Sequence, residues 1–388
     1  MRWLLLFLIT TSSWAYYPYE IKSSGESVVC DDTFLELKNT PPIRDQGSIG
    51  ICYAFSSLLL LEHHKCSKEA NPQSCYSSNR ASAVDMSKHF KTMAENEIRI
   101  GGDPITVLTR FSTQRKLVNE SCTHLDNWKK LGYEPHYDDF FHQIHAAIEQ
   151  GAGHDDILCY AQDLNKQNFG TVDDLYQTLL KAKNLSVGQL RSEVLYKKGC
   201  TAPSVSFPAY QVHTYPTYRE KKSNQGILNF VKANLDSSNP VEVSFCAAKD
   251  ANGQCYYHST VITGMRNVCS SRGCQVQYKI QNSYGKSWQD MHDDGWVSST
   301  KINESIINTS GLYLNSITSP GKSLPKTTYK AHSSRPQYNG VCGMNTIIHS
   351  PKEDSHPGTK STIFECKDNQ GRMHFSDHPL PGMFCKAK

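Results

Sequence analysis

The sequence predicts an α+β protein in which helices come first and strands come later. Apolar residues at helical spacing fill three early stretches, namely 52–64, 83–94 and 105–117. Apolar and polar residues alternate, as in strands, in three later stretches, namely 241–245, 259–263 and 276–280. Helices and strands that are segregated along the chain indicate an α+β arrangement.

Composition narrows the classes of function. The chain has 388 residues, with 41 Lys and Arg against 37 Asp and Glu, so its net charge is only +4. This charge is too small, and too evenly spread, for a nucleic-acid-binding protein. No stretch reaches the eighteen apolar residues that a membrane-spanning helix needs. We therefore expect a globular protein, monomeric, with no nucleic-acid partner and no integral membrane segment.

The N-terminus has the pattern of a cleavable signal peptide over 1–15. Arg2 supplies the positive charge, residues 3–9 are apolar, and the segment ends in the small residue Ala15. The alternative is a buried N-terminal strand. With the signal peptide removed, the protein is expected to be secreted or periplasmic.

Between the predicted elements, breaks in the pattern suggest the organisation of the chain. Residues 16–39 form a short polar lead, and prolines at 41 and 42 end it. Residues 119–225 are polar and hard to interpret, although 140–149 and 172–182 have helical spacing. Residues 318–360 are rich in Pro, Ser, Lys and Thr and are predicted to be a linker.

The fourteen cysteines fit an exported protein, because disulfides persist in oxidising compartments. Three pairs are close enough in sequence to be candidate bridges: Cys66/Cys75, Cys246/Cys255 and Cys269/Cys274. Spacing alone does not settle the connectivity. No pair has the spacing of a zinc site. His63, His64 and Cys66 are a weaker candidate for a metal cluster, with exposed residues at a helix end as the alternative.

The segment from Gln46 to Ser56, QGSIGICYAFS, carries the strongest chemical signal. Cys52 is expected at a helix N-terminus, where the helix dipole and free backbone N–H groups stabilise a thiolate. Gln46 can offer a side-chain N–H to a substrate carbonyl, forming an oxyanion hole with the N–H of Cys52. Cys52 is thus the candidate nucleophile, and a buried or disulfide-bonded cysteine is the alternative.

At these residues the sequence resembles the papain-like, or cathepsin-type, cysteine peptidases, whose pattern contains C-G-[SA]-C-[WY]. Ile49 stands where the family has a disulfide-bonded cysteine, Ile51 where it has Ser or Ala, and Tyr53 where Trp is commonest. The family's best-known disulfide is therefore absent, and another source of rigidity is expected.

Two downstream segments resemble the rest of the family's site. His258, in YHSTVITG, matches the general base, and Asn282, in QNSYGKSW, matches the residue that orients it. Tyr284 replaces the usual Trp and Trp288 matches; both are expected to shield the Asn–His hydrogen bond from water. A structural histidine is the alternative for His258 taken alone. His258 follows Cys52 at a greater separation than the family's ~130–150 residues, which suggests an insertion within 119–225.

The resemblance covers about 40–317 and implies two subdomains, one helical with Cys52 and one β-barrel-like with His258 and Asn282, with the active site in a cleft between them. Gly101 and Gly102 resemble the family's glycine pair, whose backbone binds extended substrate; an ordinary turn is the equal alternative. Tyr257 is a candidate for the specificity pocket. The implied mechanism needs no metal and no cofactor.

The tail, 361–388, resembles a small hairpin module of exported proteobacterial proteins. Its segment FECKDNQGRMHFSDHP contains two strand-like runs around a plausible turn. Cys366 and Cys385 are candidates to staple a unit so small. A disordered tail is the alternative.

The sequence therefore predicts a secreted cysteine endopeptidase that hydrolyses polypeptides through Cys52, His258 and Asn282 and a thioester intermediate. One alternative is a catalytically inactive binding protein that keeps the fold. Another is a Cys–His amidase or acyl transferase that acts on a non-protein substrate.

Overall fold

A computed structural model describes residues 27–47, 49–90, 97–131, 140–217, 220–249, 255–270 and 273–330, together with four short strands further on. The predicted signal peptide lies outside these residues. The chain divides into a main unit, which holds everything from 28 to 346, and a small unit formed by 347–388 with 23–27. All candidate site residues belong to the main unit.

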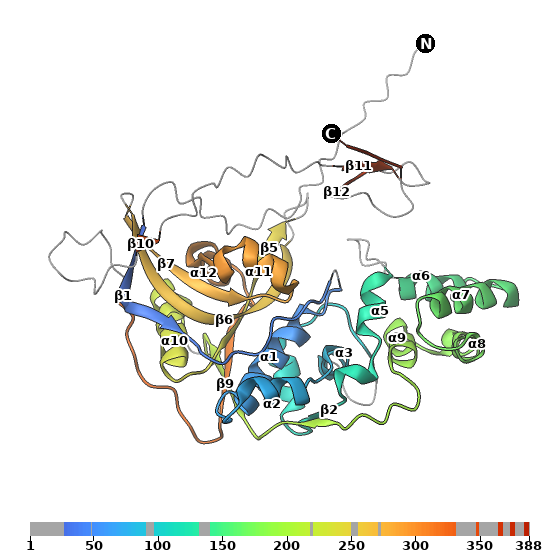
Figure 1. Ribbon diagram of the computed structural model, residues 1–388, viewed down its shortest axis with the longest axis horizontal. Helices are drawn as coiled ribbons and strands as arrows, with labels where there is room; N and C mark the ends of the chain where they lie inside the picture. The colour runs from blue at the N-terminus through green and yellow to red at the C-terminus, as the bar shows by residue number, and fades with distance from the viewer. Residues whose placement is uncertain are drawn as a thin grey trace, which may run out of the picture. The chain divides into compact units, whose positions relative to one another are not determined.

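The first half of the main unit is helical (Figure 1). It begins with α1 (Cys52–Cys66), α2 (Pro72–Ser78), α3 (Ala83–Ser87), η1 (Lys88–Phe90) and α4 (Pro104–Phe111). It continues with η3 (Glu120–Cys122), α5 (Leu125–Lys130), α6 (Phe140–Glu149), α7 (His154–Lys166), α8 (Val172–Leu180), η4 (Ala182–Asn184) and α9 (Val187–Leu195). Two short strands, β2 (Lys116–Leu117) and β3 (Val205–Ser206), pair along its edge.

The other half of the main unit, which also includes the N-terminal strand, is built on an antiparallel sheet. Its strands are β1 (Ser27–Glu36), β4 (Gln211–Tyr215), β5 (Val241–Lys249), β6 (Cys255–Ser270), β7 (Gly273–Gln281), β8 (Trp296–Ser298) and β9 (Leu314–Thr318). The order is β1-β6-β5-β9-β4, and β7 pairs with both β6 and β8. Its helical segments are α10 (Asn224–Asp236), α11 (Gly285–Met291), η5 (Asp293–Gly295) and α12 (Ser299–Asn308). The predicted α+β class is confirmed, but the described strands do not close, so the expected barrel-like subdomain is an open sheet.

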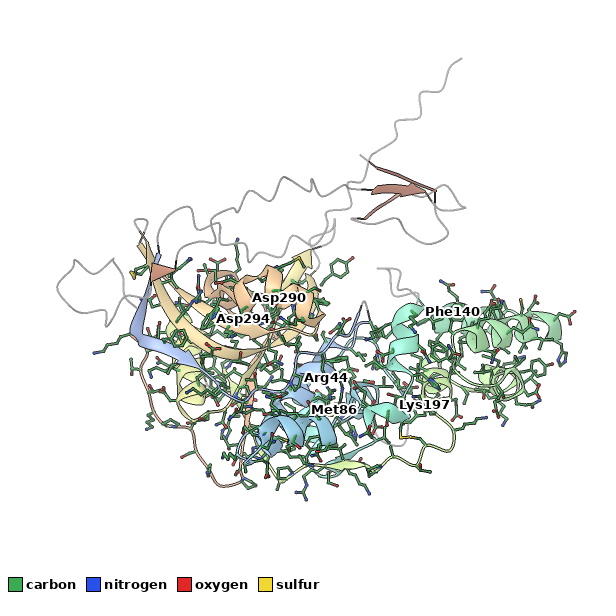
Figure 2. All side chains as sticks on the ribbon, in the orientation of Figure 1. Arg44, Met86, Phe140, Lys197, Asp290 and Asp294 are labelled. Carbon is green, nitrogen blue, oxygen red and sulfur yellow. A yellow bond between two sulfur atoms is a disulfide. The ribbon has the colours of Figure 1, made fainter. Side chains whose placement is uncertain are left out.

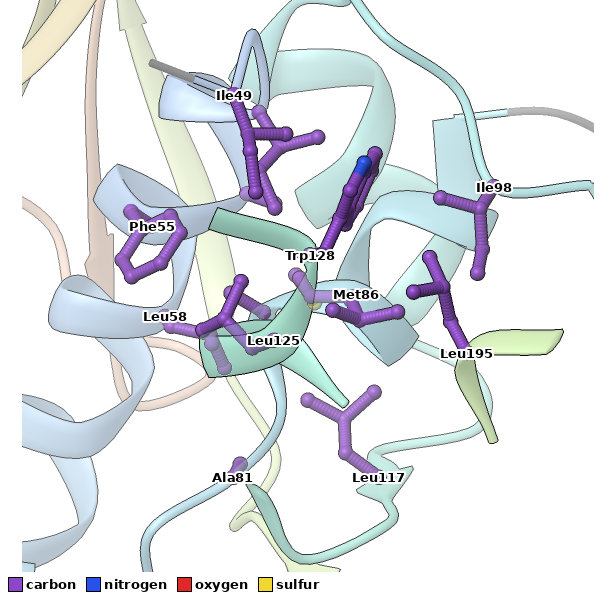
Figure 3. Packing of buried hydrophobic residues seen from close by; sticks show 14 of the residues in the cluster. Ile49, Phe55, Leu58, Ala81, Met86, Ile98, Leu117, Leu125, Trp128 and Leu195 are labelled. Carbon is purple, nitrogen blue, oxygen red and sulfur yellow. The ribbon is translucent and has the colours of Figure 1, made fainter. Parts of the chain in front are cut away.

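Two cores stabilise these halves. In the helical half, α1, α3, α5 and α9 contribute Phe55, Leu58, Met86, Trp128 and Leu195 to one cluster, as Figure 3 shows. In the sheet half, α10 and α12 pack their apolar faces on Val241, Val243 and Phe245 of β5. Helix α1 packs against β5, β6 and β9, and is buried around most of its circumference. This helix therefore joins the two halves and fixes where Cys52 lies.

Several predicted elements differ from the observed ones. The stretch 105–117 is not one helix: α4 ends at Phe111, the backbone of Arg115 adopts a left-handed conformation (φ 53°), and Lys116 and Leu117 form β2. The stretch 83–94 is a short helix followed by a 3-10 turn up to Phe90, and its remainder lies outside the described residues. The polar lead contains β1, which the sequence analysis missed.

The polar stretch after α4 contains a helical excursion, residues 125–195, that carries helices α5 to α9. Its ends meet at a base where Thr123 pairs with Tyr196 and the Lys197 amide bonds the Cys122 carbonyl at 2.9 Å. A disulfide between Cys122 and Cys200 closes this base. The excursion contributes to the helical core through α6, α7, α8 and α9. It is thus an integral part of the helical half.

The three disulfides that the sequence suggested, Cys66–Cys75, Cys246–Cys255 and Cys269–Cys274, are confirmed. Among the described residues, Cys52 and Cys159 are free thiols.

Residues 319–330, at the start of the predicted linker, remain on the main unit. Tyr329 is buried there, and its amide bonds Asn229 of α10 at 2.8 Å.

The small unit contains β10 (Ile347–Ile348), β11 (Phe364–Lys367), β12 (Met373–Ser376) and β13 (Phe384–Ala387). Strand β11 lies between β12 and β13, antiparallel to both, so the tail has one strand more than the predicted hairpin. The register pairs Cys366 with Cys385. The staple expected between their side chains falls outside the described residues.

Candidate active site

Cys52 is the first residue of α1, as predicted, and Ile51 is its N-cap. Cys52 as a whole residue is half-buried. Burial raises the pKa of Cys52 to about 11, although hydrogen bonds from the backbone N–H groups of Ser259 and Tyr53 act in the opposite direction. Helix α1, which begins at Cys52, packs against β6, the strand that carries Ser259 and the candidate base His258.

His258 lies on β6, which turns back into β7 so that the two strands run antiparallel. Asn282 directly follows β7, and its Oδ1 accepts a hydrogen bond from His258 Nε2 at 2.8 Å. The same oxygen accepts the Ser283 amide at 2.7 Å, which fixes the orientation of the Asn282 side chain. Because Oδ1 can only accept, Nε2 carries the hydrogen, and Nδ1 is the basic nitrogen of the neutral ring.

The environment of His258 is closed and aromatic. Tyr284 stacks on the imidazole, and its hydroxyl lies 3.4 Å from Nδ1. Phe245 of β5 meets the ring edge-on, with centroids 5.9 Å apart. This burial lowers the pKa of His258 to about 4, although the Asn282 hydrogen bond acts in the opposite direction. Cys52 and His258, each taken alone, are therefore neutral near pH 7.

Gln46 is buried and held at both ends of its amide. Its Nε2 donates to the Ile49 carbonyl at 2.7 Å, and its Oε1 accepts from the Ser283 hydroxyl at 2.5 Å. The amide nitrogen carries two hydrogens, so one donor remains beyond the Ile49 bond. Gln46 is thus oriented by the residue next to Asn282.

The segments around Gln46 and Asn282 are also joined through their backbones. The Gln46 amide bonds the Ser283 carbonyl at 2.7 Å, Asp45 pairs with Tyr284, and the Gly285 amide bonds the Arg44 carbonyl. Arg44, labelled in Figure 2, then reaches α1 and pairs with the buried Glu62 at 2.6 Å. These contacts tie the segment before Cys52 to the strand end that carries Asn282, and they supply rigidity without the family's disulfide.

Ile49 and Ile51, which depart from the family pattern, are both buried in the helical core. Tyr53 donates to the Arg99 carbonyl at 2.8 Å and so holds the loop that precedes α4. The departures in the motif therefore serve packing around the start of α1.

The predicted substrate-binding residues are less closely connected to the site. The Gly101 amide bonds the Gly50 carbonyl at 2.8 Å, which brings the glycine pair beside the Cys52 motif. Gly101 has a φ of 75°, and a Cβ at Gly102 would lie 2.8 Å from the Tyr53 ring. The backbone conformation at Gly101 and the close packing at Gly102 thus explain why glycine occupies both positions, independently of any substrate. Tyr257 is 55% exposed, so its ring is accessible beside His258.

Trp288 lies in α11, is buried, and stacks on His292 with centroids 4.2 Å apart. Tyr284 is the residue that stacks on His258, and the shielding role of Trp288 stays a prediction.

No group of side chains suited to a metal ion occurs in the ranges that the structure describes. Cys66 of the weaker candidate cluster is bonded to Cys75, and His63 is buried rather than exposed. None of the helices in these ranges is long and apolar enough to cross a bilayer.

Sequence analysis missed three residues that support the site: Ser283, Ser259 and Glu242. Ser283 holds Gln46, while Ser259, on the His258 strand itself, bonds Glu242 of the neighbouring strand β5 at 2.8 Å. The available signal was Glu242 itself, a charged residue between Val241 and Val243 in a predicted strand.

Comparisons with known proteins give a family match only in the tail, where residues 357–388 match "Domain of unknown function (DUF4124)". No curated protein sequence is significantly similar to the chain.

Among solved structures, a recombinant stem bromelain precursor matches with 12% identity and a TM-score of 0.38, covering 73% of this chain and 68% of that one. The bromelain protease from Ananas comosus in complex with the E64 inhibitor matches with 13% identity and a TM-score of 0.34, covering 71% and 93%. SERA5E from Plasmodium falciparum matches with 14% identity and a TM-score of 0.38, covering 76% and 98%. At this level of similarity the matched structures support no functional argument, so the proposed function rests on the geometry of the site.

Proposed function

We propose that this protein is an exported papain-like cysteine endopeptidase that cleaves extended polypeptides. The observation that carries the proposal is the pair of contacts around His258. Asn282 holds Nε2 at 2.8 Å, and the hydroxyl of Ser259, the residue next to His258, lies 2.6 Å from the hydroxyl of Ser56 on the helix that begins at Cys52. A cysteine at a helix start, a histidine with one basic nitrogen and a residue that orients it are the parts of an activated nucleophile.

The reaction starts from a neutral pair. One proton moves from Cys52 Sγ to His258 Nδ1, and the two charges formed offset the desolvation that each would suffer alone. The thiolate attacks the peptide carbonyl carbon, and the carbonyl oxygen becomes an oxyanion. The remaining N–H of Gln46 and the backbone N–H of Cys52 are its donors.

The intermediate then collapses. The imidazolium of His258 gives its proton to the leaving amine, and the C–N bond breaks to leave a thioester on Cys52. Water attacks the thioester with His258 as the base, which releases the carboxylic acid and restores the thiol. Asn282 keeps Nε2 protonated throughout, so that Nδ1 faces the reacting atoms.

Export is the second part of the proposal. The charged and apolar pattern over 1–15 fits a signal peptide. The four disulfides among the described residues fit an oxidising compartment. We place the mature protein in the periplasm or outside the cell.

Hydrolysis of an unstructured protein such as casein tests the peptidase assignment. The oxidatively refolded mature chain is expected to cleave casein under mild reducing conditions, and Cys52→Ala should remove the cleavage. Cys159→Ala is the matched control, because Cys159 is the other free thiol in the described ranges and lies exposed on α7. Cleavage that survives in Cys52→Ala would contradict the assignment. Turnover of small amides without any cleavage of casein would favour the amidase alternative.

A further inference from the structure

A buried carboxylate lies under the candidate site. Glu242, the second residue of β5, is fully buried. Its Oε1 accepts hydrogen bonds from the Ser244 and Ser259 hydroxyls, each at 2.8 Å, and its Oε2 accepts the Asn315 side-chain amide at 2.6 Å. No cation is among these recorded hydrogen-bond partners. A charge buried in this way is costly, so a structural role alone is a poor explanation for it.

The hydrogen bonds of Glu242 lead to both reacting residues. Ser259 has no role in the predicted triad, but it directly follows His258 on β6. The Ser259 hydroxyl also lies 2.6 Å from the hydroxyl of Ser56, which is one turn after Cys52 on α1. Glu242 therefore anchors the residue that follows the base and that connects the base's strand to the helix beginning at Cys52.

The placement follows from the alternation of β5. Val241, Val243 and Phe245 pack into the core with α10 and α12. Glu242 and Ser244 point to the opposite face, where α1 packs. The register pairs Ser244 with Ser259 and Phe245 with His258, so the polar face of β5 lies directly beside the strand that carries the base.

We propose that Glu242 is a positioning residue for Cys52 and His258, and that its charge sets how readily Cys52 becomes a thiolate. The inference deepens the proposed function, on which its catalytic meaning rests. A negative charge at Glu242 opposes a second negative charge on the nearby Cys52 sulfur. A protonated Glu242 keeps the hydrogen-bonded frame without this repulsion.

Burial raises the pKa of Glu242 to about 7, against the three hydrogen bonds that favour the carboxylate. The charge thus develops as the pH rises through neutrality. Titratable groups on the elements around this face include Asp103 before α4, His213 on β4, His258 and Arg266 on β6, and Cys52, Glu62, His63, His64 and Lys65 on α1. On the opposite face, α10 and α12 carry Lys232, Asp236, Lys301 and Glu304. Among these groups, Asp103 acts electrostatically on Glu242, and its negative charge raises the pKa of Glu242 further.

The test is the pH profile of Cys52 alkylation by iodoacetamide, followed by mass spectrometry of the intact chain from about pH 5 to about pH 10. This readout needs no peptide substrate, so it is separate from casein hydrolysis, which tests the proposed function. In Glu242→Gln the profile should move to lower pH. The rate at about pH 8 should rise about threefold for each unit by which the thiol pKa falls, after allowance for the weaker nucleophile.

Two further variants make the result specific. Glu304→Gln removes the same charge from the exposed face of α12 and should leave the profile unchanged. Glu242→Gln combined with Asn315→Asp exchanges the amide and the carboxylate across a 2.6 Å contact and should return the profile toward that of the wild type. A merely structural role for Glu242 would not produce this return. A Glu242→Gln profile that superimposes on the wild type, or a double variant that does not move back, would overturn the inference.

Discussion

The imidazole ring of His258 and the phenol ring of Tyr284 lie stacked, with centroids 4.7 Å apart and an interplanar angle of 8°. Asn282 holds the same imidazole at Nε2, and Phe245 meets its edge. The candidate base is therefore fixed on three sides before any substrate binds. Such preorganisation limits rotation of the ring.

Tyr284→Phe keeps the stacked ring, so we expect kcat to change by less than about twofold. Tyr284→Ala removes the contact and exposes the His258–Asn282 hydrogen bond to water. An aromatic pair contributes about 1 kcal/mol, which corresponds to about fivefold in rate. Steady-state kinetics on a peptide substrate should show this loss in kcat. Equal losses in Phe and Ala variants would mean that the hydroxyl, and not the ring, is the important group.

Gln46→Ala should lower kcat by about 100- to 1000-fold, because it removes one of the two oxyanion donors. Ser283→Ala leaves Gln46 in place but removes the hydroxyl that holds its Oε1. We expect a smaller loss, about tenfold, and the KM should stay close to the wild-type value in both variants. Undiminished turnover in Gln46→Ala would exclude this residue from the oxyanion hole.

His258→Ala should reduce turnover nearly as much as Cys52→Ala, since the nucleophile and its base act as a unit. Asn282→Ala should cost less, because Asn282 only orients the ring. The double variant of His258 and Cys52 should be no slower than either single variant. Additive losses, measured as kcat/KM on the same peptide, would show that the two residues do not act together.

Stability should fall in acid through His63 on α1. Its Nε2 donates to the Ser238 carbonyl, its Nδ1 is buried without a recorded hydrogen bond, and burial lowers its pKa to about 4. In this pH range the unfolded state binds a proton at His63 more readily than the folded state does. This penalty is absent above the unfolded pKa of about 6.5 and grows as the pH falls to about 4, reaching on the order of 3 kcal/mol.

His63→Gln should flatten this dependence, because glutamine can still donate to Ser238 and does not titrate. Urea unfolding at about pH 7 and about pH 4.5 measures the effect, with Cys52→Ala as the background to prevent self-cleavage. His258 contributes in the same direction and is present in both proteins, so the comparison isolates His63. If the free energy of unfolding changed between the two pH values by the same amount with and without His63→Gln, the acid sensitivity could not be assigned to His63.

Local sequence patterns predicted the parts of the site that are local in the chain. The helix start at Cys52 follows from small residues before an apolar run, and His258 and Asn282 lie in or next to alternating strands. Antiparallel pairing of neighbouring strands then brings His258 and Asn282 together. These features require little information from distant parts of the chain.

The features that were missed depend on distant partners. The prediction of a helix at Leu117 is wrong, because the strand that pairs with this residue, at Val205, lies far along the sequence. The Cys122–Cys200 disulfide closes a long excursion, and no spacing rule indicates it. Glu242 is a charged residue within a predicted strand, but its structural role depends on Ser259 and Asn315, which come from two other strands.

The most direct test of the central claim is the relative reactivity of two thiols in one molecule. Cys52 and Cys159 are both free, and Cys159 is the more exposed. If His258 activates Cys52, an epoxide probe at neutral pH should label Cys52 at least about tenfold faster than Cys159, and His258→Ala should remove the difference. Labelling that follows exposure alone, with Cys159 reacting first in the wild type, would contradict the account.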